Sequence, residues 1–480
     1  MTSRSARLAS VAVLAGSLCA AACRDVNAPA APVSSLRLST DSAVVHVDST
    51  LQLAAEVLDS VGHPLTGRRV WWLVFDTTIA SVDSAGVLRG IAVGPTSLVA
   101  ASESVVVQIP VAVVTNLQSV APGSALSCGL APDGSPYCWG ESFFGTANLV
   151  RVPLVPRMRR LAVGWYHACG LTDAGEVYCW GTSTALGGGD SASATFSTAH
   201  VSGGGPFTAL AAGDRSTCGL SATGEVYCWG YNTRGALGAR IYSSTPVSVT
   251  PGRTFGTMSG PSLHSCALTA AGEAFCWGYN MYGQLGSHAS SADCPNLVNG
   301  NPCTPVPTRV DSVPPLASIS VGLYHTCGLT GAGEAYCWGD GDFGVLGDTA
   351  RGVCFATSYL FADYPCSERP VRVAGGLRFA SISAGSNLTC ALTRDGDAYC
   401  WGDNRHGSFG DGTANGSVTP VRAGGGLRFR TLAAGGYYSV CGLALDGVAH
   451  CWGYNRVGQL GVGVPMGVDQ LVPARVLWQP

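Results

Sequence analysis

Pairs of cysteines ten positions apart recur along most of this chain and restrict its fold more than any other feature. Each pair lies in one recurring unit, for example Cys169-Gly-Leu-Thr-Asp-Ala-Gly-Glu-Val-Tyr-Cys179-Trp-Gly. Two short apolar runs around a glycine-containing turn predict a β-hairpin. Two cysteines equidistant from the turn then face each other on neighbouring strands, within the Cα separation that a disulfide requires. Seven such disulfides are predicted: Cys128 with Cys138, Cys169 with Cys179, Cys218 with Cys228, Cys266 with Cys276, Cys327 with Cys337, Cys390 with Cys400, and Cys441 with Cys451.

The remaining cysteines also favour disulfides. Cys294 and Cys303 lie in one insertion, and we expect them to pair. Cys354 and Cys366 lie in another, which gives nine pairs and leaves two cysteines near the N-terminus. Zinc is the alternative, but its sites usually take cysteines two to four positions apart, and one pair per repeat supplies only two of four ligands. The cysteines therefore predict an oxidising compartment and no metal.

The charged residues and motifs exclude several classes of function. All 27 basic residues are arginine and the net charge is −3, so we expect no nucleic-acid partner. A chain without lysine has neither a Walker-type phosphate loop nor a Schiff-base lysine. Gly-x-Ser-x-Gly, His-Glu-x-x-His and dinucleotide fingerprints do not occur, so the sequence indicates no catalytic residues and no cofactor.

The first residues predict export. Arg4 and Arg7 precede an apolar stretch at 8–18, and small residues lead to Cys23, so residues 1–23 are interpreted as a secretory signal too short to span a membrane. The segment resembles a bacterial lipoprotein signal, in which Cys23 would be the lipidated first mature residue. Cleavage to a freely secreted form is the alternative. The resemblance implies a bacterial cell-envelope protein that contacts the membrane only through its lipid anchor.

A cysteine-free region follows the signal and a linker at 24–33 rich in alanine and proline. Residues 34–114 alternate apolar and polar residues in short runs such as Val105-Val-Val-Gln-Ile, which predicts a β-sandwich. The order Val70-Trp-Trp, Ile79-Ala-Ser-Val and Gly86-Val resembles the bacterial immunoglobulin-like domains of group 2. That resemblance implies a stalk or an adhesive module, and a spacer is the simpler interpretation.

A second recurring phrase follows each Cys-Trp-Gly. Gly230-Tyr-Asn-Thr-Arg-Gly-Ala-Leu-Gly238 and Gly453-Tyr-Asn-Arg-Val-Gly-Gln-Leu-Gly461 are two of its copies. Together with the cysteine units, it strongly resembles the regulator of chromosome condensation repeat over residues 116–480. The resemblance implies a seven-bladed β-propeller, so the expected fold class is all-β, with a propeller after an immunoglobulin-like sandwich. Each blade buries both faces only between neighbours, so the ring must close.

Two features of the repeats bear on packing. The segment Pro473-Ala-Arg-Val-Leu matches Thr245-Pro-Val-Ser-Val, which we interpret as the opening strand of a blade. We therefore expect it to pair with the blade that holds Cys128. One tryptophan at a fixed position in each repeat favours packing between blades over a ligand cage: Trp139, Trp180, Trp229, Trp277, Trp338, Trp401 and Trp452.

Repeated histidines and glutamates are candidate site residues. Three histidines stand two positions before the first cysteine of a repeat, where other repeats have Leu or Ser, which favours a structural role over metal binding or catalysis: His167, His264 and His325. Four glutamates follow the turn glycine, and a ring of them could bind cations or a basic partner, although solvated turns are the simpler interpretation: Glu176, Glu225, Glu273 and Glu334.

Two long insertions, at 287–311 and 348–369, follow the same phrase in consecutive repeats and should emerge near each other on one face. The second is rich in the aromatic residues favoured at binding hot spots. The alternative is a loop that packs on its own blade. The predicted binding residues are Phe355, Tyr359, Phe361 and Tyr364.

These features predict an exported, lipid-anchored, non-catalytic binding or scaffold protein that engages an unknown protein or glycan. The family resemblance also implies guanine-nucleotide exchange, but that activity acts on an intracellular GTPase, whereas this chain is predicted to be exported. Bacterial relatives of the propeller include a secreted protein that inhibits β-lactamase. An enzyme at the propeller face, a lyase or hydrolase, is the alternative, and converging acidic and histidine side chains at the channel mouth would favour it. A purely structural envelope protein is a third hypothesis.

Overall fold

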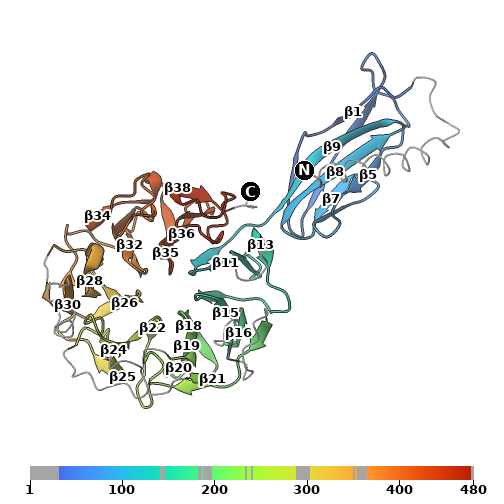
Figure 1. The fold of residues 1–480 in the computed structure, drawn as a ribbon. Helices are drawn as coiled ribbons and strands as arrows, with labels where there is room; N and C mark the ends of the chain where they lie inside the picture. Colours follow the sequence, from blue (N-terminus) through green and yellow to red (C-terminus); the bar gives the residue numbers. More distant parts are fainter. Residues whose placement is uncertain are drawn as a thin grey trace. The chain divides into compact units, whose positions relative to one another are not determined.

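The computed structural model describes residues 32–140, 146–181, 186–187, 197–232, 235–238, 242–287, 303–349, 352–353 and 365–476. The chain divides into two compact units, the first ending at Thr115 and the second beginning at Asn116. Strands dominate both units (Figure 1). Within the described ranges no helix has the length and apolar character needed to cross a membrane.

The N-terminal unit is a β-sandwich. Its strands are β1 (Ser35–Leu38), β2 (Ala43–His46), β3 (Thr50–Gln52), β4 (Ala55–Leu58), β5 (Trp71–Val74), β6 (Ala80–Val82), β7 (Val87–Gly90), β8 (Gly94–Ser102) and β9 (Val105–Val114). They form the sheets β2-β9-β8-β5, β3-β7-β6 and β1-β4. Leu88 of β7 and Leu98 of β8 are fully buried in one apolar cluster, so the first two sheets share a core. The immunoglobulin-like assignment of this sandwich stays a prediction.

The C-terminal unit is a seven-bladed β-propeller. Within the described residues, each blade is an antiparallel sheet whose four main strands follow one another in the chain, and Figure 1 shows the blades arranged in a ring. The fifth blade has an additional short strand, β29, beside β30. The order of strands therefore matches the order of the sequence repeats.

The first three blades are β10 (Ser119–Pro122), β11 (Leu126–Leu130), β12 (Pro136–Gly140) and β13 (Thr146–Arg151); β14 (Arg160–Val163), β15 (His167–Leu171), β16 (Val177–Gly181) and β17 (Ser197–His200); and β18 (Phe207–Ala212), β19 (Ser216–Ser221), β20 (Val226–Tyr231) and β21 (Tyr242–Ser248). The next two are β22 (Thr257–Ser259), β23 (His264–Leu268), β24 (Ala274–Tyr279) and β25 (Cys303–Arg309); and β26 (Leu316–Val321), β27 (His325–Thr330), β28 (Ala335–Asp340), β29 (Gly352–Val353) and β30 (Pro365–Arg372), with the 3-10 turn η2 (Asp342–Gly344). The last two are β31 (Ser381–Ala384), β32 (Leu388–Leu392), β33 (Ala398–Gly402) and β34 (Ser417–Arg422); and β35 (Phe429–Ala434), β36 (Ser439–Ala444), β37 (Ala449–Gly453) and β38 (Gln470–Arg475), with η4 (Gly424–Gly426) before β35.

The two middle strands of each blade form the predicted disulfide-linked hairpin. Cys169 of β15 lies directly opposite Cys179 of β16, with their Cα atoms 4.0 Å apart, and the other six pairs are 4.1 Å apart. Such a short separation is typical of the non-hydrogen-bonded pairs of an antiparallel ladder. All seven predicted hairpin pairings are present, and these cysteines are at most 1% exposed, so the bonds lie inside the packed blades. Cys303 and Cys366 are also disulfide-bonded, whereas their predicted partners Cys294 and Cys354 lie outside the described residues.

The repeated tryptophans fill the space between blades, as predicted. All seven are at most 2% exposed. The indole Nε1 of Trp277 donates a hydrogen bond to the carbonyl of Ala236 at 2.9 Å, and that of Trp401 donates to the carbonyl of Val345 at 2.9 Å. Both acceptors belong to the Gly-x-Leu-Gly phrase of the preceding blade. The phrase therefore supplies a carbonyl for the tryptophan of the next blade.

The predicted pairing of the C-terminal strand with the first blade is wrong. β38 pairs with β37 of the seventh blade, where Ala474 lies opposite Cys451. The matching phrase at Thr245 lies in β21, the outermost strand of its own blade, where Val247 lies opposite Cys228. The phrase therefore ends a blade rather than opening one, and each sequence repeat forms a whole blade.

Side-chain packing closes the ring between the seventh blade and the first. Trp139 Nε1 and Ser127 Oγ both donate to the carbonyl of Gln459, at 3.0 and 2.8 Å. Gly461 makes this approach possible: its φ is +65°, and an added Cβ would lie 2.5 Å from the Trp139 ring. The junction uses the same phrase as the other blades, so closure requires no exchanged strand.

Candidate functional site

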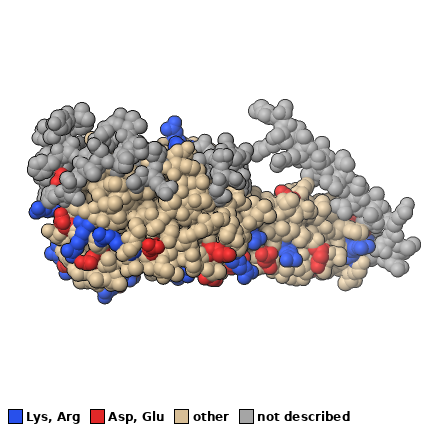
Figure 2. Space-filling model, turned by 90° about the horizontal axis from the view of Figure 1, so that it is seen from below, with Lys and Arg blue, Asp and Glu red and all other residues tan. Residues whose placement is uncertain are grey.

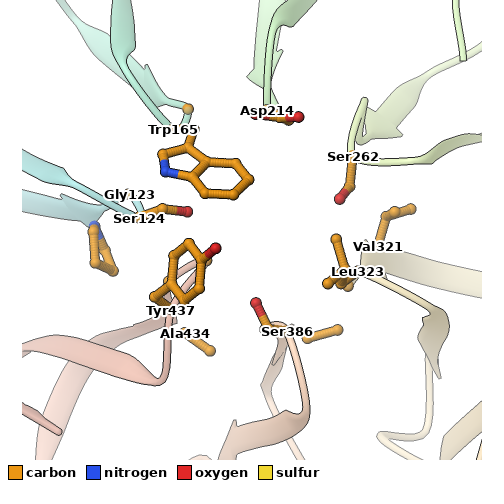
Figure 3. Close-up of a pocket in the computed structure, with 18 of the residues that line it drawn as sticks. Gly123, Ser124, Trp165, Asp214, Ser262, Val321, Leu323, Ser386, Ala434 and Tyr437 are labelled. Carbon is orange, nitrogen blue, oxygen red and sulfur yellow. The ribbon is translucent and has the colours of Figure 1, made fainter. Parts of the chain in front are cut away.

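Seven loops, each joining the first and second strands of a blade, converge on the propeller axis. They enclose a cavity of about 410 Å³, which we call the channel mouth. Figure 3 shows the Trp165 indole and the Tyr437 ring on one side of the open centre, with Asp214 next to Trp165 and Ser262 and Ser386 across from them. The side of the propeller that carries these loops is called the mouth face.

Hydrogen bonds between neighbouring blades hold the mouth loops in place. The backbone N–H of Trp165 donates to the carbonyl of Gly213 at 3.1 Å, and that of Leu323 donates to the carbonyl of Gly385 at 3.1 Å. The innermost strands are joined in a similar way, since serine hydroxyls of three blades accept backbone N–H groups of the following blades. A partner that binds this pre-formed mouth therefore loses little entropy through ordering of the loops.

Aromatic rings form an arc along one side of the mouth. The rings of Trp165 and Tyr166 stack with centroids 5.6 Å apart, and Tyr437 meets Trp165 edge-on at 4.9 Å. Tyr454 continues the arc 6.3 Å from Tyr437, and the His406 ring lies 4.7 Å from Tyr454. Tyr166 and Tyr437 are 39% and 38% exposed. Clustered, exposed aromatic residues on a rigid support are typical of a binding surface.

A second aromatic cluster lies at the loops of the fourth and fifth blades. The rings of Tyr279, Tyr282 and Tyr324 lie within 6.5 Å of one another, and Tyr324 lines the cavity. Both clusters combine residues of the inner loops with residues that follow the Cys-Trp-Gly phrase. The mouth face therefore carries aromatic residues from several blades.

Asp214 is the single ionisable carboxylate among the described residues that line the cavity. Burial raises the pKa of this carboxyl, and Arg215 opposes the shift. Burial also raises the pKa of Tyr437, so its phenol keeps its proton. No histidine is found among the described lining residues, and in the same described part no group of three or more His, Cys, Asp or Glu could hold a metal. The described part of the mouth thus offers aromatic faces, hydroxyls and one carboxylate.

The comparison with known families agrees with the architecture. The family model of the RCC1-like domain matches residues 120–441 of the 480. This chain belongs to the RCC1-like domain family. The match covers most of the propeller and none of the N-terminal sandwich, so the family assignment of the sandwich is not tested by it.

Several curated proteins are similar to parts of this chain at low identity. The ultraviolet-B receptor UVR8 of Arabidopsis thaliana is 30% identical over 176 residues, which are 36% of this chain and 37% of the receptor. The ubiquitin ligase HERC2 of Homo sapiens is 34% identical over 112 residues, or 23% of this chain and 2% of the ligase. The matches therefore span little more than a third of the first relative and a small part of the second.

Solved structures support the propeller fold. Yeast RCC1 (Prp20), solved with Kap60, has a TM-score of 0.57 at 21% identity, over 75% of this chain and 85% of that chain. Human WBSCR16 has a TM-score of 0.56 at 21% identity, over 69% of this chain and 88% of that chain. At such identities the likeness concerns the fold of the RCC1-like propeller and not its partners.

The three repeated histidines of the RCC1-like propeller are buried between blades. His264 Nε2 lies 2.6 Å from Thr326 Oγ1, whose hydroxyl donates to the carbonyl of Gln284 at 2.9 Å. The threonine oxygen therefore accepts from the imidazole, which fixes the neutral tautomer with the proton on Nε2. Burial lowers the pKa of His167 to about 4 and those of His264 and His325 to about 3. These histidines join neighbouring blades and do not reach the mouth.

The turn glutamates lie on the opposite side of the propeller from the mouth, because a hairpin turn and the loop before it leave opposite ends of a strand. Glu273 pairs with Arg309 at 2.8 Å, and Glu334 pairs with Arg372 and Arg378 at 2.7 Å each. Figure 2 shows acidic and basic atoms intermixed along one side of the molecule rather than a patch of one sign. In the blades of Glu273 and Glu334, solvated turns with surface ion pairs are observed in place of free carboxylates.

The predicted binding residues Phe355, Tyr359, Phe361 and Tyr364 lie outside the described residues. The strands that flank the two insertions, β24 with β25 and β28 with β30, can still be placed. Connections between third and fourth strands leave a blade at the same end as those between first and second strands, so both insertions begin and end on the mouth face. Phe343, 41% exposed, lies in η2, shortly before the second insertion.

Sequence reasoning missed the residues that line the mouth. In most blades the loop between the first and second strands begins with a glycine, and the residue after this glycine differs from blade to blade, while the residues around it repeat. This variable residue is Trp165, Asp214, Leu323 or Ser386 in four of the blades. A variable position inside a repeated phrase, at the end of a strand, was the available signal. Repetition around this position favours an architectural interpretation, which conceals the variable residue.

Proposed function

We propose that this protein is a non-catalytic scaffold that captures a protein partner on the mouth face of its propeller. The observation that carries the proposal is the pre-formed cavity of about 410 Å³ beside the exposed Tyr166 and Tyr437 rings. Buried or half-buried aromatic anchors around a rigid hollow dominate the energetics of many protein interfaces. Relatives support a protein as the partner, since yeast RCC1 is solved with Kap60 and Prp20p has reported binding to Gsp1p and histones.

A capture experiment with matched variants tests this function. The mature protein and its Trp165→Ala/Tyr437→Ala variant are used to capture envelope and culture proteins, and a stoichiometric partner is then titrated. We expect the variant to lose about 2 kcal/mol of binding free energy or more, about thirtyfold in Kd, with little change in melting temperature. The control is Glu273→Ala/Arg309→Ala, which removes an ion pair of the turn face.

The outcome separates the mouth face from other surfaces. Equal capture by both variants would show that the partner binds elsewhere, for example on the N-terminal sandwich. Alanine at Phe355, Tyr359, Phe361 and Tyr364 tests whether the second insertion extends the surface. Binding of soluble oligosaccharides in place of any protein would assign a glycan instead.

We further propose that the protein works at the bacterial cell envelope, held by a lipid on Cys23, with residues 34–114 as an immunoglobulin-like spacer. The seven buried disulfides support an oxidising compartment. Mass analysis of the mature N-terminus should find diacylglycerol on Cys23, and Cys23→Ser should abolish recovery in the membrane fraction. An unmodified mature N-terminus would instead indicate a secreted protein.

A further inference from the structure

We propose that the channel mouth accepts the guanidinium of an arginine side chain from the captured protein. This inference rests on the proposed function and names the chemistry that enters the cavity. A volume of about 410 Å³ suits a side chain and its flanking backbone rather than a folded element.

The carboxylate of Asp214 is unpaired among the described residues. Among the described residues it has no hydrogen-bond or ion-pair partner, although it lines the cavity and is partly buried. Arg215, the next residue, is exposed and acts on it only through space. A partly desolvated carboxylate without a partner gains more from an arriving cation than a solvated one does. Burial that raises the pKa of Asp214 agrees with this desolvation.

Aromatic and hydroxyl groups line the same open centre as this carboxylate. In Figure 3 the Trp165 indole, the Tyr437 hydroxyl and the Ser262 and Ser386 hydroxyls surround the open centre. A guanidinium stacks on an indole face and directs five N–H donors outward in its plane, so the Asp214 carboxylate beside Trp165 can accept from it while further donors point into the hydroxyl-lined centre. A lysine ammonium has three donors and no flat face, so arginine fits this set better.

The chain itself contains the same combination elsewhere on the mouth face. The guanidinium of Arg405 lies 4.7 Å from the centre of the Phe343 ring and 6.0 Å from that of Tyr438. Its Nη2 lies 2.6 Å from the buried Asp403 carboxylate. Asp214 likewise lies beside an aromatic ring, that of Trp165, and no arginine among the described residues forms an ion pair with it.

Short peptides test the inference without knowledge of the partner. Acetyl-Gly-Arg-Gly-amide is compared with the corresponding citrulline and lysine peptides by ligand-observed NMR titration of the mature protein. Citrulline keeps the shape of arginine and lacks its charge. We expect millimolar binding of the arginine peptide, weaker binding of lysine, and binding of citrulline that is weaker by about tenfold. Asp214→Asn should remove the preference for arginine over citrulline at unchanged melting temperature, whereas the charge-matched control Glu273→Gln should keep it.

Two results would overturn the inference. One is equal binding, or no binding at about 10 mM, of the arginine and citrulline peptides. The other is a preference for arginine that survives Asp214→Asn. If either occurs while Trp165→Ala/Tyr437→Ala still abolishes protein capture, the proposed function stands and only the occupant of the mouth is wrong.

Discussion

Acidification should destabilise the propeller through the three histidines buried between its blades. The pKa of His167 is lowered to about 4 and those of His264 and His325 to about 3, against 6.5 for the free side chain, because burial disfavours the charged imidazole. Above pH 6.5 the imidazoles are neutral in both states, and their contribution to stability is complete. Below that pH the unfolded chain takes up protons that the folded chain cannot, so stability is lost until the pH approaches the folded values.

The size of the effect follows from the shifts. At about pH 5 each histidine costs about 2 kcal/mol relative to neutral pH, and the three together cost about 6 kcal/mol. The double variant His325→Leu/Thr389→Val removes one of these histidines together with its threonine partner. At the next junction between blades the same two positions hold Leu388 and Val440, which pack in one apolar cluster, so the variant replaces a polar pair by an apolar pair that the chain already uses. The carbonyl that Thr389 releases keeps its hydrogen bond from Trp401 Nε1.

Urea unfolding of both proteins at about pH 7.5 and about pH 5, followed by tryptophan fluorescence, provides the measurement. Between the two pH values the variant should lose about 2 kcal/mol less free energy of unfolding than the wild type. Carboxylates that titrate in the same range contribute equally to both proteins and cancel in the difference. Equal losses would show that His325 does not stay neutral in the folded state, and would refute the reasoning.

Three other properties should follow from the packing. The hairpin disulfides should resist dithiothreitol in the native protein, because their cysteines are at most 1% exposed. Only after unfolding should dithiothreitol release thiols that iodoacetamide then labels; rapid labelling of the native protein in the presence of dithiothreitol would contradict this. Gly461→Ala should lower the free energy of unfolding by about 1 kcal/mol more than the control Gly467→Ala. Both glycines have positive φ, but only Gly461 lies against Trp139. Equal urea midpoints for the two variants would argue against closure of the ring through the contact of Gly461 with Trp139. Truncation after Gly467 removes β38, which belongs to the seventh blade. Hydrogen-exchange protection should therefore weaken in β37 and stay unchanged in β10 to β12. Lost protection in β11 would instead support pairing of the C-terminal strand with the first blade.

Features encoded within one repeat could be predicted from the sequence. The hairpins, the seven disulfides and the buried tryptophans follow from spacing and from the resemblance, because each depends on residues close together in the chain. The role of the Thr-Pro-Val phrase could not be settled in this way. Repetition shows that the phrase recurs once per blade but not whether it begins or ends one, and only its pairing with the strand of Cys228 decides.

Features that require neighbouring blades could not be predicted. His167, His264 and His325 each meet a threonine that follows in the next repeat, about 50 to 64 positions away. The mouth residues lie on separate loops, and each resembles an ordinary turn residue until the ring closes. Trp165 and Asp214 line one cavity only because strand order and blade order place every inner loop at the axis.

Hydrogen exchange of the complex with the captured partner shows which face of the propeller holds that partner. Free and bound protein are compared by mass spectrometry, with peptides that cover the inner loops and the hairpin turns. We expect slower exchange in the loops at 163–166 and 434–438, with no change in the turns at 173–175 and 270–273. Protection confined to those turns or to residues 34–114 would contradict the claim that the mouth face holds the partner.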